Sequence, residues 1–168
     1  MDIPVILYDV PKFTGYTIPP ALVKRLASEF SGLVGLKDSS NDPSLMAEFI
    51  RLVGDRTAIL SGSGDMILPT LQMGGKGAIA AIGNVAPRIC VSLYEEFVSG
   101  NSAEALQYHM KACLLNKVLV KEHNQIAALK EALKLIGRNV GMPRSPVKPL
   151  DTKGKESVAN VLRSLEII

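Results

Sequence analysis

The sequence has no marked excess of charge of one sign. Its 168 residues include 19 lysines and arginines against 16 aspartates and glutamates, a net charge of +3, and this surplus is spread along the chain. A nucleic-acid-binding surface usually appears as a cluster of basic residues. We therefore expect no nucleic-acid partner.

Cysteine and histidine are scarce. The two cysteines, Cys90 and Cys113, lie in apolar stretches of helical spacing, and neither has a metal-ligand spacing to His109 or His123. We expect buried, reduced thiols in a cytoplasmic protein. The same scarcity predicts no metal site, and neither histidine has a partner that would suggest a catalytic role.

Long apolar runs are also missing. Glycine and proline interrupt the longest uncharged stretches, and the first ten residues contain two aspartates and no basic cluster. We expect neither a membrane-spanning helix nor a signal peptide. With 47% hydrophobic and 21% charged residues, the composition is that of a folded domain with a sizeable core rather than a disordered chain.

The first hundred residues alternate between two patterns. Short apolar runs, typical of strands covered on both faces, alternate with stretches of helical spacing. The predicted strands are residues 4–8, 33–37, 57–61 and 77–82, and the predicted helices are residues 21–30, 44–53, 66–73 and 88–99. This α/β pattern predicts a parallel sheet, in either a doubly wound fold or an arc of a (β/α)8 barrel.

After residue 100 no further strand-like run appears. Residues 102–121, 125–136 and 156–165 have helical spacing, and a proline-rich segment, residues 142–150, precedes the last of these helices. We therefore expect two parts, a barrel segment at residues 1–100 and a carboxyl-terminal helical appendix at residues 101–168.

Lys37 is the most informative single residue, because it ends an apolar strand and precedes Asp38. Apolar surroundings disfavour an ammonium ion, and the neutral amine of a lysine attacks ketones to form a Schiff base. The carboxyl ends of parallel strands are also where α/β active sites lie. The alternative is a lysine that only leaves the strand and pairs with Asp38 or another carboxylate of the loop.

Tyr8 ends the preceding predicted strand in the same way. In a parallel sheet its phenol reaches the same pocket as Lys37 and could relay protons there. The alternative is an aromatic cap on the core with its hydroxyl bound to backbone. The glycine-rich residues 62–65 and 74–77 lack the spacing or context of a phosphate loop, and Asn84 is more simply read as a helix cap.

Several motifs, taken in order, resemble one family. Residues 6–11 and 14–15 (ILYDVP, TG), 34–40 (VGLKDSS), 60–63 (LSGS), 74–79 (GGKGAI), 84–87 (NVAP), 129–134 (LKEALK) and 144–146 (RSP) carry the resemblance. Together they are similar to the dihydrodipicolinate synthase and N-acetylneuraminate lyase superfamily. The chain resembles only the second half of that family, beginning at its fifth barrel strand, without the family's Gly-Thr-Thr-Gly-Glu-like loop.

The resemblance implies a (β/α)8 TIM barrel and class I aldolase chemistry on pyruvate or another 2-oxo acid. Lys37 would be the Schiff-base lysine and Tyr8 the proton-relay tyrosine. Gly62 would line the floor of the pocket, and the carbonyl of Ile79 would face the site. It further implies no metal or organic cofactor, an aldehyde as second substrate, and a homo-oligomer, a tetramer in the family.

The substrate is less clear from the residues. Phe13 stands where dihydrodipicolinate synthases carry an arginine for a substrate carboxylate, and Asp9 replaces their asparagine. Gly64 and Ala81 fall where sialic-acid lyases offer polar side chains. We therefore favour slightly a lyase for a 2-oxo-3-deoxy sugar acid or similar hydroxy-oxo acid. The alternatives are the 4-hydroxy-tetrahydrodipicolinate synthase reaction of lysine biosynthesis and a catalytically silent half-barrel that binds a partner.

Overall fold

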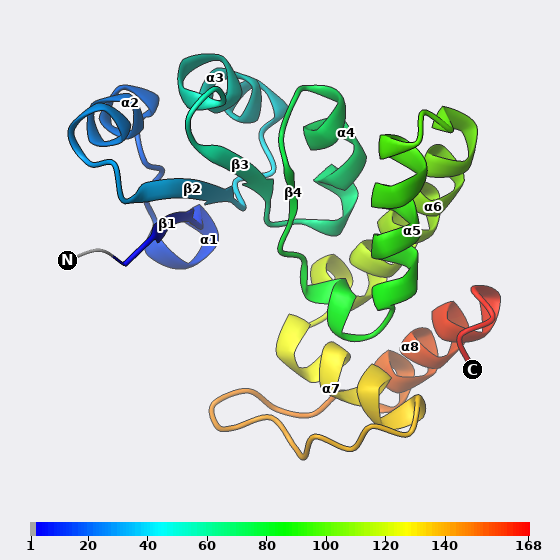
Figure 1. The fold of residues 1–168 in the computed structure, drawn as a ribbon. Helices are drawn as coiled ribbons and strands as arrows, with labels where there is room; N and C mark the ends of the chain where they lie inside the picture. Colours follow the sequence, from blue (N-terminus) through cyan, green and yellow to red (C-terminus); the bar gives the residue numbers. More distant parts are fainter. Residues whose placement is uncertain (1–2) are drawn as a thin grey trace. The chain divides into compact units, whose positions relative to one another are not determined.

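The computed structural model describes residues 3–168. They form two compact units, divided between Ala80 and Ala81 (Figure 1). The first unit holds all four strands of the sheet, and the second is helical. The helix that follows the last strand belongs to the second unit, whereas the sequence pattern places it in the barrel segment.

The sheet of the first unit is parallel, with its strands in chain order. β1 (Val5–Asp9), β2 (Leu33–Asp38), β3 (Ala58–Ser61) and β4 (Gly77–Ala78) lie side by side. Three of them agree with the predicted strands to within a residue or two. The predicted strand at residues 77–82 is wrong in length, because Ala81–Asn84 forms a 3-10 helix, η2, in the second unit.

Helices connect successive strands and cover one face of the sheet (Figure 1). They are α2 (Pro20–Glu29), α3 (Pro43–Val53) and α4 (Ile67–Gln72), the last preceded by the 3-10 helix η1 (Gly64–Met66). The start of α3 is fixed by Asp42, whose carboxylate accepts hydrogen bonds from the backbone N–H of Ser44 and Leu45. The predicted loop after β1 is not wholly irregular, since it contains the one-turn helix α1 (Pro11–Thr14).

The core of this unit lies between the sheet and its helices. Leu36 and Ile59 are opposite each other in the register and pack against Phe49 and Met46 of α3 and Val23 of α2. All five side chains are almost fully buried, and burial of each stabilises the fold by about 1.5–3 kcal/mol. Leu7, the partner of Leu36 on β1, extends the same apolar row.

The opposite face of the sheet is uncovered in the described structure. Ile6 of β1 and Ile79 after β4 are large hydrophobic residues with about half of their surface exposed. Side chains alternate between the two faces of a strand. The exposed residues and the buried core residues therefore belong to opposite faces of one sheet.

The second unit is an arrangement of packed helices. After η2 come α5 (Pro87–Val98), α6 (Ser102–Asn116), a π-helical segment, η3 (Lys117–Glu122), α7 (Gln125–Leu135) and α8 (Thr152–Ser164). α5 packs on α6, and α7 packs on α8 and η3. The prediction that Asn84 caps α5 is wrong. The cap position belongs to Ala86, and the Asn84 amide instead donates to the Ala81 carbonyl.

Both cysteines are free thiols on helices of the second unit, Cys90 on α5 and Cys113 on α6. Burial raises the pKa of the Cys90 thiol, which keeps it protonated and unreactive. Cys113 Sγ lies 3.4 Å from Nε2 of His109 on the same helix. Among the described residues, no helix has the length and apolar character needed to span a membrane.

Candidate active site

Tyr8 and Lys37 lie opposite each other near the carboxyl ends of neighbouring strands. The parallel register pairs Tyr8 of β1 with Lys37 of β2, so both side chains leave the same face of the sheet. This is the uncovered face, opposite the apolar core. The structure thus brings together the two residues that the sequence predicts to carry the chemistry.

The two side chains are in direct contact. Lys37 Nζ lies 3.9 Å from the centroid of the Tyr8 ring, within the distance of a cation–π contact. Tyr8 is 48% exposed, which leaves its ring accessible to a small molecule. Lys37 does not form an ion pair with Asp38 or another carboxylate among residues 3–168, so the simple salt-bridge interpretation of this lysine is wrong.

The phenol of Tyr8 is acidified by its neighbours. Partial burial by itself raises the pKa of Tyr8, but the polar contacts of Ser39 and Lys37 and the positive charge of Lys37 together lower it below its ordinary value. A phenol with a lowered pKa gives up its proton more readily near neutral pH. The electrostatics of the pair therefore suit a group that donates and accepts protons.

Ser39 is a site residue that the sequence analysis did not assign. It follows Lys37 by two positions, the spacing that keeps side chains on one face of an extended chain. Its hydroxyl is buried and makes no fully formed hydrogen bond among the described residues, yet it lies close enough to lower the pKa of Tyr8. The two-residue period after Lys37 is the signal that could have identified it.

Gly62 provides the space that Ser39 occupies. A Cβ built on Gly62 would overlap the Ser39 hydroxyl, and the Gly62 N–H donates to the Asp38 carbonyl at 2.7 Å. Gly62 is therefore tied to the residues that follow Lys37. Its predicted place at the floor of the pocket remains a prediction, since no bound molecule is present.

Ile79 follows β4, on the far side of β3 from Lys37. Its backbone N–H donates to the Ser61 carbonyl at 2.8 Å, which continues the ladder beyond the end of the strand. Ile79 thus lies at the same edge of the sheet as Gly62 and Lys37, as expected. The predicted role of its carbonyl in the site stays a prediction.

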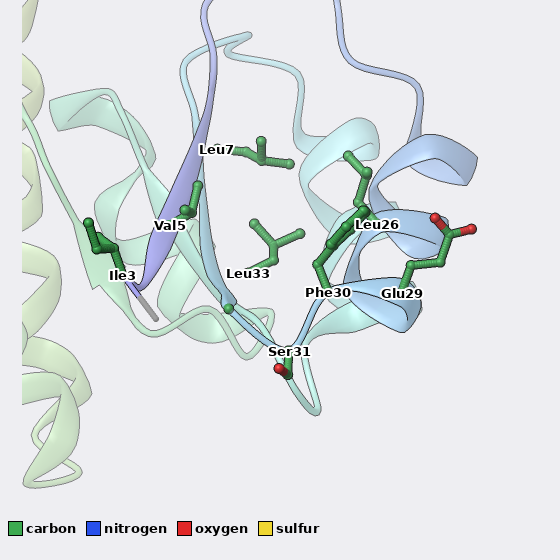
Figure 2. A pocket seen from close by; sticks show the side chains of 9 residues that line it. Ile3, Val5, Leu7, Leu26, Glu29, Phe30, Ser31 and Leu33 are labelled. Atoms are coloured by element: carbon green, nitrogen blue, oxygen red, sulfur yellow. The ribbon is translucent and has the colours of Figure 1, made fainter. Parts of the chain in front are cut away.

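A groove of about 420 Å³ lies at the other end of the strands and does not include Lys37 or Tyr8. Figure 2 shows apolar side chains around it from β1, α2 and the start of β2, including Val5, Leu26, Phe30 and Leu33. It borders β1, which is an edge strand of the sheet. Its position at the amino ends of the strands separates it from the lysine–tyrosine pair.

The described residues contain no group of three or more histidine, cysteine, aspartate or glutamate side chains placed to hold a metal ion. The chemistry of this edge of the sheet is instead that of an amine, a phenol and a hydroxyl. An α/β parallel sheet that places a lysine amine beside a tyrosine phenol at its carboxyl edge, where the active sites of such folds lie, can support imine chemistry on a carbonyl compound.

A family model described as the dihydrodipicolinate synthetase family matches residues 1–165. The chain belongs to this family. It is 40% identical to the 4-hydroxy-tetrahydrodipicolinate synthase of Archaeoglobus fulgidus over all of its length, which is 57% of that relative. It is 35% identical to the synthase of the same name from Methanopyrus kandleri, again over the whole chain and 56% of the relative.

Solved structures of family members have the same fold as this chain. The chain matches a dihydrodipicolinate synthase from Thermotoga maritima with a TM-score of 0.94 and 30% identity, covering 100% of this chain and 58% of that one. It matches YagE, a family protein from E. coli K12 in complex with pyruvate, with a TM-score of 0.92 and 33% identity, covering 98% and 57%. The fold is therefore that of a (β/α)8 barrel family, and the chain spans rather more than half the length of its relatives.

Proposed function

We propose that this chain carries the Schiff-base lysine of a pyruvate-dependent lyase. The observation that carries the proposal is the contact between Lys37 and Tyr8 at the carboxyl edge of the sheet. Family membership supports the same chemistry. Because the chain covers only part of its relatives, the remaining polar groups of the site would come from residues outside it.

In this proposal the neutral amine of Lys37 attacks the carbonyl carbon of pyruvate. The carbinolamine that forms loses water and leaves a protonated imine, which withdraws electrons from the neighbouring methyl carbon. Loss of a proton from that methyl group gives an enamine, and its carbon attacks the aldehyde. Tyr8, next to Nζ and with a lowered pKa, carries protons to and from the carbinolamine and the new hydroxyl group. No metal or organic cofactor is needed.

The names of the relatives support the 4-hydroxy-tetrahydrodipicolinate synthase reaction more than a sugar-acid reaction. In that reaction the aldehyde is aspartate semialdehyde. One observation favours the second candidate, a hydroxy-aldehyde acceptor. Phe13 of α1 is 72% exposed and offers no group for a carboxylate, where the synthases carry an arginine.

The imine is tested by chemical trapping in the full-length protein. Incubation with pyruvate and borohydride should leave a reduced adduct on the peptide that contains Lys37. The Lys37→Arg variant should lose the adduct, whereas the control Lys76→Arg should keep it, because Lys76 is an exposed lysine just before β4. An adduct on Lys76, or none at all, contradicts the assignment.

The aldehyde is tested by comparing specificity constants for aspartate semialdehyde and glyceraldehyde at saturating pyruvate. The synthase reaction predicts a higher kcat/KM with the semialdehyde. A higher value with glyceraldehyde supports the second candidate and leaves the imine on Lys37 intact. Trapping of pyruvate without turnover of either aldehyde would mean that another acceptor is used.

A further inference from the structure

Two buried aspartates, Asp9 and Asp38, directly follow Tyr8 and Lys37 in the sequence. Asp9 and Asp38 are the last residues of β1 and β2 and are opposite each other in the register. As neighbours of Tyr8 and Lys37 in sequence, they point to the opposite face of the sheet, the one covered by helices. They are only 1% and 2% exposed.

Each of the two carboxylates holds the loop that follows its own strand. Asp9 Oδ1 accepts a hydrogen bond from the backbone N–H of Ile18 at 3.0 Å, just before α2. Asp38 accepts from the N–H of Ser40 at 2.9 Å and from its hydroxyl at 3.0 Å. The pair therefore connects the ends of the two catalytic strands to the loops around the site.

No positive charge compensates the pair. Neither aspartate forms an ion pair within residues 3–168. On the packed helices, Arg25 pairs with Glu29 and Arg51 with Glu48, all on exposed side chains. The other charged or titratable groups on these helices and the flanking loops are all exposed, namely Lys12, Tyr16, Lys24, Asp42, Asp55 and Arg56. Asp42 adds to the negative charge that acts on Asp38.

The cost of ionising both groups follows from their placement. Asp9 and Asp38 are opposite each other on neighbouring strands, whose backbones lie about 4.8 Å apart, and a negative charge on a buried neighbour disfavours ionisation of a carboxyl group. Burial raises the pKa of Asp38, and the charges of Asp9 and Asp42 raise it further, against the lowering effect of the Ser40 hydrogen bonds. Asp9 Oδ2 is buried and has no hydrogen-bond partner among the described residues, so a charge there is poorly solvated.

We propose that Asp38, which faces the buried Asp9 across the sheet, is a positioning residue that retains its proton, and that this proton keeps the ends of β1 and β2 together with Tyr8 against Lys37. The catalytic consequence rests on the proposed function, whereas the retained proton does not. Loss of the proton sets two buried charges against each other at the strand ends. A raised folded-state pKa contributes stability at low pH that is lost as the pH rises through it.

The proton is observed directly by infrared spectroscopy of the full-length protein. The carbonyl stretch of a protonated aspartic acid should persist to higher pH than an ordinary aspartate allows, because the pKa of Asp38 is raised. Asp38→Asn should abolish this band, and Asp9→Asn should shift its midpoint to lower pH. Both asparagines can still accept the backbone hydrogen bonds, so the loops stay attached.

Asp42→Asn is the matched control. It removes one negative charge near Asp38 and keeps the cap of α3, because asparagine caps helices as well as aspartate. Its midpoint should move much less than that of Asp9→Asn. The retained proton of Asp38 is refuted if the wild-type band titrates with ordinary aspartates, or if Asp42→Asn shifts it as far as Asp9→Asn.

The catalytic consequence is read from the rate of imine trapping against pH. In the wild type this rate should fall as Asp38 loses its proton, and in Asp9→Asn the fall should disappear, because only one buried charge can then form at the strand ends. Identical profiles in the two proteins refute the positioning role. Failure of wild-type Lys37 to trap pyruvate at any pH refutes the proposed function instead, and the infrared result then decides whether Asp38 retains its proton.

Discussion

Replacement of Gly62 by alanine tests how closely the ends of β2 and β3 are packed. A Cβ at this position would overlap the Ser39 hydroxyl and lie 2.9 Å from the Asp38 carbonyl oxygen. The backbone cannot easily move away, because the Gly62 N–H donates to that same oxygen at 2.7 Å. The added methyl group must therefore displace Ser39 or strain the strand end.

The expected change in the unfolding free energy of Gly62→Ala follows from two opposing effects. Overpacking of a tight site costs about 1–3 kcal/mol of unfolding free energy, and glycine-to-alanine replacement stabilises by about 0.4–1 kcal/mol through the unfolded chain. The control is Gly32→Ala in the same unit, where the nearest atom to the new Cβ is the Ile3 carbonyl oxygen at 3.6 Å. The control should be more stable than the wild type, so the unfolding free energies of the two variants should differ by about 1–3 kcal/mol.

Urea unfolding of the two variants and the wild type measures this difference by linear extrapolation. A second readout concerns the site, since displacement of Ser39 removes one of the contacts that lower the pKa of Tyr8. Phenolate absorbance, with Tyr8→Phe as reference, should therefore titrate at higher pH in Gly62→Ala. Equal stability of the two alanine variants would refute the packing argument, and an unmoved Tyr8 titration would refute the link from Gly62 to Tyr8.

Three further outcomes are expected. Tyr8→Phe should still trap pyruvate on Lys37 but slow turnover by about 10²-fold or more, the scale of a lost acid–base group, and unchanged turnover would leave Tyr8 a packing residue. Phe13→Arg should raise kcat/KM for aspartate semialdehyde relative to glyceraldehyde, and an unchanged ratio would exclude this position from acceptor choice. A polypeptide of residues 1–168 alone should self-associate and lack lyase activity, because β1 is an open edge and Ile6, Val34 and Ile79 are exposed. A monodisperse, active monomer in sedimentation equilibrium would contradict that expectation.

The sequence by itself determined the local elements and the chemistry-bearing residues. Apolar runs and helical spacing predicted three strands and most helices to within a few residues, because these patterns depend on neighbours in the chain. Lys37 and Tyr8 could be selected because each ends such a run and because their motifs resemble a family. The family assignment is confirmed by the match over residues 1–165. The last strand, β4, was predicted too long because apolar residues 79–82 have the composition of a strand without its pairing.

The tertiary structure alone decided which residues meet across the sheet. The contact of Nζ with the Tyr8 ring, the fit of Ser39 into the space left by Gly62, and the burial of Asp9 beside Asp38 all depend on strand register. Register is a non-local property, set when the apolar face of the whole sheet packs on α2 and α3. A carboxylate at the end of a strand looks like a loop residue in the sequence. Only the register shows that two of them are buried together, on the face opposite Lys37 and Tyr8.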